Sequence, residues 1–228
     1  MSQRPYVLLS CAMSVDGYID DASPERLRLS SAADFDRVDG VRATCDAILV
    51  GAGTIRADDP KLLVKSAARR KRRVERGMPP DLVKVTISAS GDLDPDARFF
   101  TTGDSPKLVY APPAVVPGLA ERLGERAEVV DAGDPPDLAA MLADLDKRGV
   151  RRLMVEGGGG IHTRFLTAGL ADEVQLVVAP FFIGDPSAPR FVGPGVFPQS
   201  PERPMRLAEA TRIGDLVLLR YLLGGARG

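Results

Sequence analysis

The chain has very few of the side chains that carry metal or thiol chemistry. Its 228 residues include one histidine, His162, and two cysteines, Cys11 and Cys45. So few soft ligands make a zinc site or a Cys–His nucleophile pair hard to assemble. Two scattered cysteines also exclude a disulfide framework and suit a reducing compartment. We therefore expect a cytoplasmic protein that holds no metal.

An excess of one charge and a long apolar run are missing as well. Thirty Lys and Arg residues oppose 31 Asp and Glu, for a net charge of −1. This balance removes any global reason to expect nucleic acid or an anionic membrane as a partner. The most apolar window, Leu176–Gly184, is far shorter than a membrane span. The N-terminus also lacks a signal-peptide pattern. Any chemistry must then use carboxylates, hydroxyls, backbone groups and an imported cofactor.

Apolar runs that alternate with helical patterns predict an α/β fold. Near-continuous runs of Val, Leu and Ile indicate strands that are covered on both faces of a mostly parallel sheet. A Gly214-Asp215 pair between the last two runs predicts a C-terminal antiparallel hairpin. With no repeat and no linker, residues 1–228 are expected to form a single domain. The predicted strands are Tyr6–Met13, Ala47–Val50, Val83–Ser88, Lys107–Ala111, Glu128–Val130, Arg152–Glu156, Glu173–Ala179, Met205–Ala210 and Leu216–Leu222.

Helices are predicted where apolar residues recur at spacings of three and four. Ser31 is the expected N-cap of the first helix. The basic run Lys65–Pro80 is interpreted as a solvated basic helix or surface excursion, and binding of phosphate or nucleic acid is the alternative. Phe181–Pro204, rich in proline and glycine, is expected to wrap the surface. The predicted helices are Ala32–Thr44, Pro113–Arg126, Pro136–Arg148 and Ile161–Leu170.

Two glycine-rich turns follow predicted strands. Gly51-Ala52-Gly53-Thr54 comes after one apolar run, where bare backbone lets a ligand approach closely. The run Gly157-Gly158-Gly159-Gly160 follows another and precedes a helix, whose free N-terminal amides favour an anion. Because ligands gather at the carboxyl ends of strands in open α/β sheets, one dinucleotide is expected to span both turns.

Polar side chains at the same strand ends are candidates for proton chemistry and anion binding. Asp16, Asp58 and Glu156 supply carboxylates, and Glu156 is the hardest to explain as a simple turn residue, because a carboxylate ending a buried strand needs a partner. Arg42 is either a phosphate anchor or a surface ion pair. His162, at the start of a predicted helix, is interpreted as a cap or a surface side chain.

An ordered set of short motifs resembles the pyrimidine reductases of riboflavin biosynthesis. The match covers nearly the whole chain and is similar to the stand-alone enzyme, or to the reductase half of the bifunctional deaminase-reductase. The motifs are Pro5-Tyr6-Val7, Ala12–Gly17, Arg37-Val38, Arg42-Ala43, Asp46–Thr54, Asp58-Asp59-Pro60, Val155–Gly159, Gly169–Glu173 and Ala179-Pro180.

The resemblance implies a dihydrofolate-reductase-like fold, a homodimer and NADPH as cofactor. It also implies a phosphorylated ribosylaminopyrimidine as substrate, with hydride delivered to C1′ of its opened sugar. Asp58 and Glu156 would orient polar groups or relay a proton. The expected cofactor contacts are Ala12, Arg28, Gly51, Gly53, Thr54, Asp58, Ser88 and Gly157 to Gly160. The expected substrate contacts are Asp16, Ser30, Arg42, Leu62, Lys65 and Glu156.

Some positions depart from the pattern of many bacterial relatives. Ser10 and Tyr18 stand where those relatives carry cations, and Ala89 replaces a serine at a strand end. Two alternatives therefore stay open: an NADPH-dependent reductase of another small heterocycle such as dihydrofolate, and a non-catalytic nucleotide or nucleic-acid binding module. A cation for the NADPH 2′-phosphate could come from Arg56, Lys84 or the basic run.

Overall fold

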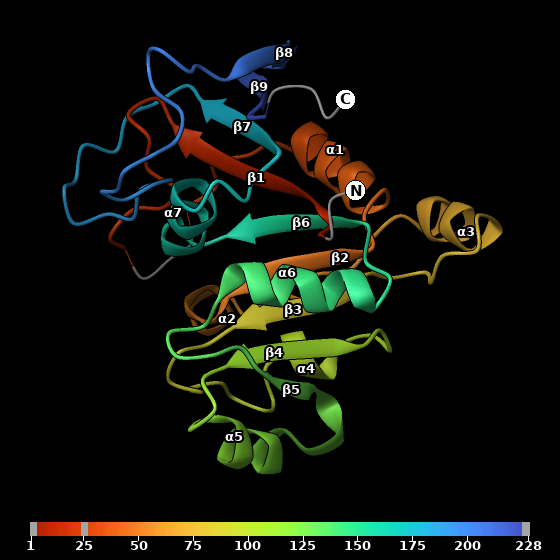
Figure 1. Cartoon of the computed structure of the whole chain (residues 1–228). Helices are drawn as coiled ribbons and strands as arrows, with labels where there is room; N and C mark the ends of the chain where they lie inside the picture. The colour runs from red at the N-terminus through yellow and green to blue at the C-terminus, as the bar shows by residue number, and fades with distance from the viewer. Residues whose placement is uncertain (1–3, 24–26, 225–228) are drawn as a thin grey trace. The chain divides into compact units, whose positions relative to one another are not determined.

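A computed structural model describes residues 4–23 and 27–224. The chain divides into two compact units. The first unit comprises Met1–Tyr6 and Asp39–Met154, and the second comprises Val7–Val38 and Val155–Gly228. Figure 1 labels the helices and strands of both units.

The first unit is built on parallel strands in the order β5-β4-β3-β2, with β6 (Arg152–Gly157) next in that order. Its central strands are apolar and almost fully buried, which is typical of strands covered on both faces. Figure 1 shows α5 beside the edge strand β5. The strands are β2 (Ala47–Gly51), β3 (Val83–Ile87), β4 (Lys107–Ala111) and β5 (Glu128–Asp131). The helices are α2 (Ala52–Asp58), α3 (Ala67–Glu75), α4 (Arg98–Thr101), α5 (Val116–Leu123), the 3₁₀ turn η1 (Gly124–Arg126) and α6 (Leu138–Lys147).

In the second unit the strand order is β6-β1-β7-β9-β8. Strands β1 and β7 are parallel, whereas β9 pairs antiparallel with both β7 and β8. Gly214, at φ 65°, allows the tight turn between the last two strands. The elements are β1 (Tyr6–Ser14), α1 (Ala32–Arg42), α7 (Gly159–Thr167), β7 (Glu173–Ala179), β8 (Arg206–Ile213) and β9 (Leu216–Leu222).

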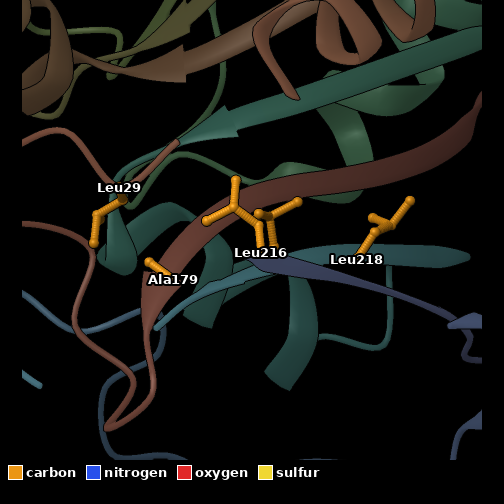
Figure 2. Packing of buried hydrophobic residues seen from close by; sticks show 5 residues of the cluster. Leu29, Ala179, Leu216 and Leu218 are labelled. Atoms are coloured by element: carbon orange, nitrogen blue, oxygen red, sulfur yellow. The ribbon is translucent and has the colours of Figure 1, made fainter. Parts of the chain in front are cut away.

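A small apolar cluster joins β7 and β9 to the segment before α1. Figure 2 shows Leu29, Ala179, Leu216 and Leu218 gathered there, and Val177 completes the buried set. Ala12 of β1 packs against the same cluster. The cluster therefore anchors the chain that leads into α1, which carries candidate site residues.

The predicted α/β fold class, mostly parallel with a C-terminal antiparallel hairpin, is confirmed. Ser31 is also confirmed as a cap, because its hydroxyl accepts from the amide of Asp34 at 3.2 Å. The glycine-rich turn at residues 51–54 is a direct strand-to-helix junction, since β2 ends at Gly51 and α2 begins at Ala52. The short helix α4 was not predicted, and β8 continues to Ile213 rather than ending at Ala210.

Candidate functional site

The four glycines at the junction of β6 and α7 differ in their surroundings. Gly158 adopts φ 80°, which only glycine tolerates easily, and a Cβ on Gly159 would lie 2.1 Å from the carbonyl oxygen of Arg190. Local geometry therefore explains both residues. Gly160 is different, because it is exposed and a Cβ there would meet nothing within 4 Å. Its backbone is open to a ligand at the first turn of α7, where the amides of the next two residues already donate to the carbonyl oxygen of Gly158.

The glycine turn of the first unit is open in the same way. Gly51 ends β2 and precedes α2 at an ordinary φ of −71°. Gly53 is exposed, and a Cβ there would also meet nothing within 4 Å. Thr54 is half-buried one residue further along α2. Bare, accessible backbone at Gly53 and at Gly160 fits the close approach of phosphate groups. The two turns lie in different units, so a dinucleotide that spans both stays a prediction.

Ser88 follows β3, whose last residue, Ile87, is paired with Gly51 of β2. The Ser88 side chain is buried, and its hydroxyl accepts from the amide of Gly91 at 3.1 Å. This bond closes the turn after β3 and gives Ser88 a structural task. A contact between Ser88 and a cofactor stays a prediction.

A loop of the first unit brings three predicted substrate residues together. Arg42, at the end of α1, donates to the carbonyl oxygen of Leu63 at 3.1 Å. Leu62 beside it is buried and adopts φ 50°, an unusual conformation for a branched side chain. Lys65 is exposed on the same loop. The two predicted phosphate-binding cations, Arg42 and Lys65, therefore lie on a helix end and a loop that are hydrogen-bonded to each other.

Asp39 of α1 holds that loop in place. Its carboxylate accepts from the amides of Lys65 and Ser66 and from the Arg69 guanidinium at 2.9 Å. Burial alone would raise the pKa of Asp39, but these hydrogen bonds and the guanidinium outweigh it and hold the pKa below its usual range. Sequence reasoning missed Asp39, because nothing in a helical pattern shows which loop a helix residue will bind.

Asp16 acts as an organiser of loops in the second unit. Its carboxylate accepts from the Ser14 hydroxyl at 2.5 Å and from the amide of Gly184 at 2.8 Å. The hydroxyl bond is the main reason why the pKa of Asp16 lies below its usual value. These contacts tie the turn after β1 to the segment after β7. A substrate contact of Asp16 stays a prediction.

Three further predicted residues lie on or near β1 and α1. Ala12 is half-buried in β1, in register with Val177 of β7. Arg28 is exposed. The hydroxyl of Ser30 donates to the Asp34 carboxylate at 2.5 Å. The Ser30 hydroxyl is therefore held by Asp34, four residues along the chain.

The two carboxylates predicted to be catalytic belong to different units. Asp58 is the last residue of α2, and Glu156 is a half-buried residue of β6. The adjacent Asp59 forms the ion pair with Arg98, at 2.8 Å. The joint role of Asp58 and Glu156 stays a prediction.

His162 is not a cap or a surface residue, so that prediction is wrong. It is fully buried in α7, and its ring lies 5.1 Å from the ring of Phe191. Burial lowers the pKa of His162 to about 4, and the backbone groups of Val155 and Phe191 offset only part of this effect. Within the described residues neither ring nitrogen makes a well-formed hydrogen bond. The residue faces inward because the segment around Phe191 covers α7.

Of the seven basic residues in the basic run, Lys65, Lys71, Arg72 and Arg76 are exposed as expected, whereas three arginines are engaged within the first unit. Arg73 is buried and donates to the carbonyl oxygens of Ala43 and Cys45 at 3.1 and 2.6 Å. Arg69 pairs with Asp39, and Arg70 donates to the carbonyl oxygen of Val64. The run does form a helix, α3, but the expectation of a solvated face is wrong for these three arginines.

The Cys11 thiol is weakly acidic. Burial raises the pKa of the Cys11 thiol to about 12, so Cys11 is a poor nucleophile. Over residues 4–23 and 27–224, no group of three or more His, Cys, Asp or Glu side chains could hold a metal ion. In the same ranges, none of the helices combines the length and the apolar character needed to cross a bilayer.

Solved structures define the class of fold. RibD from Acinetobacter baumannii superposes with a TM-score of 0.79 and 23% identity, over 98% of this chain and 59% of that one. The chain thus spans about three fifths of that protein. A pyrimidine reductase-like protein from Corynebacterium diphtheriae gives a TM-score of 0.79 at 20% identity, over 97% and 93% of the two chains. The chain therefore has the mixed α/β fold of the RibD-like reductases.

Sequence relatives then identify the family. A protein of Archaeoglobus fulgidus is 39% identical over 188 residues, which cover 82% of this chain and 85% of the relative. One of Methanothermobacter thermautotrophicus is 33% identical over 97% of this chain and 100% of the relative. Both are named 2,5-diamino-6-ribosylamino-4(3H)-pyrimidinone 5′-phosphate reductase. The profile of the RibD C-terminal domain matches residues 5–219. The chain belongs to the RibD C-terminal domain family.

Proposed function

We propose that the protein is an NADPH-dependent reductase of 2,5-diamino-6-ribosylamino-4(3H)-pyrimidinone 5′-phosphate in riboflavin biosynthesis. The observation that carries the proposal is the shared name of the two relatives, which are matched over 85% and 100% of their own lengths. The reaction converts the ribosylamino group to a ribitylamino group. The deaminated pyrimidine and another heterocycle, such as dihydrofolate, are the alternatives for the substrate.

A nicotinamide cofactor, when bound, supplies the hydride that such a reduction requires. In the first unit, Gly51, Gly53 and Thr54 offer open backbone and a hydroxyl to it. In the second unit, Gly157 and Gly158 lead from β6 into α7, and Gly159 and Gly160 begin that helix. Ala12 and Arg28 are further contacts. The open space beside Gly53 and Gly160 supports these assignments.

NADPH in particular requires a cation for its 2′-phosphate. Lys84 loses support for that role, because it is fully buried and donates to the carbonyl oxygens of Phe99 and Thr102 at 3.0 and 2.6 Å. Arg56 keeps its support, since its side chain is about half exposed on α2. Its guanidinium donates to the carbonyl oxygen of Asp92 at 2.8 Å and pairs with the Asp92 carboxylate at 3.6 Å, which leaves other guanidinium N–H groups to meet a phosphate. We assign the 2′-phosphate to Arg56, with the exposed cations of the basic run as the alternative.

The substrate phosphate is met by Arg42 and Lys65, and Leu62 shapes the loop between them. The bond from Arg42 to Leu63 supports this grouping. Ser30, Asp16 and Glu156 are the polar contacts for the remainder of the substrate. Asp58 and Glu156 orient polar groups or relay the proton that balances the hydride.

The test is a steady-state assay of the purified protein with NADPH and the diamino substrate. The rate is measured as the loss of NADPH. We expect turnover with this substrate and none with dihydrofolate. The Lys65→Ala variant should raise the KM for the pyrimidine, whereas Arg72→Ala, which removes an exposed cation from α3, should not. Turnover of dihydrofolate alone, or no oxidation of NADPH with any pyrimidine, would contradict the proposal.

Three accompanying expectations concern the protein as a whole. We propose a homodimer located in the cytoplasm and a single domain over residues 1–228. A binding module for nucleic acid loses support, because Arg69, Arg70 and Arg73 of the basic run are engaged within the first unit.

A further inference from the structure

A continuous chain of hydrogen bonds runs from Ser30 through the interior of the second unit. The Ser30 hydroxyl donates to Asp34 at 2.5 Å, and Arg37 Nε donates to the other oxygen of the same carboxylate at 2.7 Å. Arg37 also donates to the side-chain oxygen of Gln175 at 2.7 Å. The amide nitrogen of Gln175 donates to Glu173 at 2.8 Å. Arg220 completes the chain at Glu173.

Burial makes this chain well defined. The side chain of Asp34 is 3% exposed and that of Glu173 is 0% exposed. Two carboxylates alternate with two guanidinium groups, so each buried charge has a partner of opposite sign. A guanidinium can only donate, and therefore Arg37 fixes which end of the Gln175 amide faces it. The donor and acceptor roles along the chain are thus determined.

The same logic fixes the polarity of Ser30. The Asp34 carboxylate, paired with Arg37, accepts hydrogen bonds from both neighbours. The single hydroxyl proton of Ser30 therefore points to Asp34 at 2.5 Å rather than to the carbonyl oxygen of Ser31, which lies at 3.5 Å. The Ser30 oxygen then has only lone pairs to offer to any other group. A ligand that meets this oxygen must present a donor, such as a hydroxyl or an amine, and not a phosphate oxygen.

We propose that Asp34 is a positioning residue that holds Ser30 as a hydrogen-bond acceptor for a hydroxyl or amino group of the substrate. This inference rests on the proposed function. The proposed substrate carries both kinds of donor, on its ribosyl group and on its pyrimidine ring. Arg37, Gln175 and Glu173 hold Asp34 in place from α1 and β7.

The Asp34→Asn substitution tests this role because it is nearly isosteric. The new amide turns its oxygen toward Arg37, since that group only donates, and its NH₂ then donates to Ser30. The serine proton is released outward and the polarity of Ser30 is reversed. We expect the KM for the pyrimidine to rise roughly tenfold, as for loss of one hydrogen bond, with the KM for NADPH unchanged.

A matched control exists in the first unit. Asp144 likewise accepts from a hydroxyl, that of Tyr110 at 2.6 Å, and from an arginine, Arg148, at 2.7 Å. Asp144→Asn makes the same chemical change at a carboxylate outside the proposed binding groups. It should leave the KM for the pyrimidine unchanged even if it lowers the melting temperature.

Two more variants separate positioning from general damage. Ser30→Ala should raise the KM for the pyrimidine about as much as Asp34→Asn, and the double variant should lose no more than Ser30→Ala alone. Ser30→Thr, which keeps the hydroxyl, should retain the wild-type KM. Additive losses in the double variant, or an unchanged KM in Asp34→Asn, would overturn the role of Asp34. Absence of pyrimidine turnover by the wild-type protein would instead overturn the proposed function, and this inference with it.

Discussion

His162 is a buried ionisable side chain in the first turn of α7, two residues after Gly160. Its imidazole lies against Phe191 with no well-formed hydrogen bond among the described residues. A buried group of this kind stays neutral, because charging it without water or a counter-ion is costly. His162 therefore acts as part of the core at neutral pH and as a source of instability in acid.

Replacing His162 with leucine should make the protein less sensitive to acid. Burial lowers the pKa of His162 from 6.5 to about 4, so the native state binds fewer protons than the unfolded state between these values. The free energy of unfolding then falls as the pH drops from about 6.5 to 4, by at most ~3 kcal/mol from this group. Urea denaturation of both proteins at several pH values measures the difference. A wild-type minus variant difference that is constant with pH would contradict the prediction.

Substitutions in the glycine run should separate packing from ligand binding. Gly159→Ala places a Cβ 2.1 Å from the Arg190 carbonyl oxygen and should lower the melting temperature by several degrees. Gly160→Ala meets open space and should leave the fold intact while weakening NADPH binding. Thermal shift with and without NADPH measures both effects. If Gly160→Ala binds NADPH like the wild type, the run serves packing alone.

The role of a single residue could be predicted from the sequence where the residue type itself indicates that role. Glycines at strand ends indicated accessible backbone, and two of them, Gly53 and Gly160, are indeed open. Prediction failed where the role depends on how neighbouring side chains are turned in the folded chain. The burial of His162 depends on Phe191, and the bond of Ser30 depends on how Asp34 is held by Arg37. These partners are known only once the chain is folded.

At the scale of elements, α3 shows how a charged helix can be an internal brace. Arg73 is 2% exposed and donates to backbone oxygens of four residues, Ala43, Cys45, Pro79 and Asp81. Its guanidinium thus ties α3 to the chain before β2 and to the chain before β3. The buried charge is tolerated because these carbonyl groups surround it.

The Arg73→Met substitution should therefore destabilise the protein far more than the same substitution at Arg72. Methionine keeps the apolar stem but leaves buried carbonyl oxygens without donors, which should lower the free energy of unfolding by about 3 kcal/mol. Arg72→Met, at an exposed position of the same helix, should change it by less than about 0.5 kcal/mol. Urea denaturation measures both values. Equal losses in the two variants would show that α3 is not held by Arg73.

Helices and strands could be predicted from the sequence where the apolar residues form a run long enough to show a helical or strand-like spacing. The strands β4, β7 and β9 begin and end at the predicted residues. Helix α2 was missed because it has seven residues and starts immediately after β2, with no break between the two patterns. Helix α4, with four residues, is too short to show any periodicity.

The whole molecule raises the question of whether its two compact units are separate domains. The chain passes between the units at residues 6–7, 38–39 and 154–155. The second of these positions lies inside α1 and the third inside β6. Boundaries between independent domains fall in exposed linkers, where few interactions are cut. Here they fall within regular elements, so neither unit can unfold without breaking a helix or a strand that the other shares.

This connectivity predicts one cooperative unfolding transition. The chain has no tryptophan, so a single introduced tryptophan reports on one unit. Tyr6→Trp, at a half-buried position against Arg152, reports on the first unit, and Phe181→Trp, packed against the apolar cluster of Figure 2, reports on the second. Both fluorescence changes should share one urea midpoint with the circular dichroism signal, because α1 and β6 couple the units. Two separate midpoints would show that the protein comprises two domains.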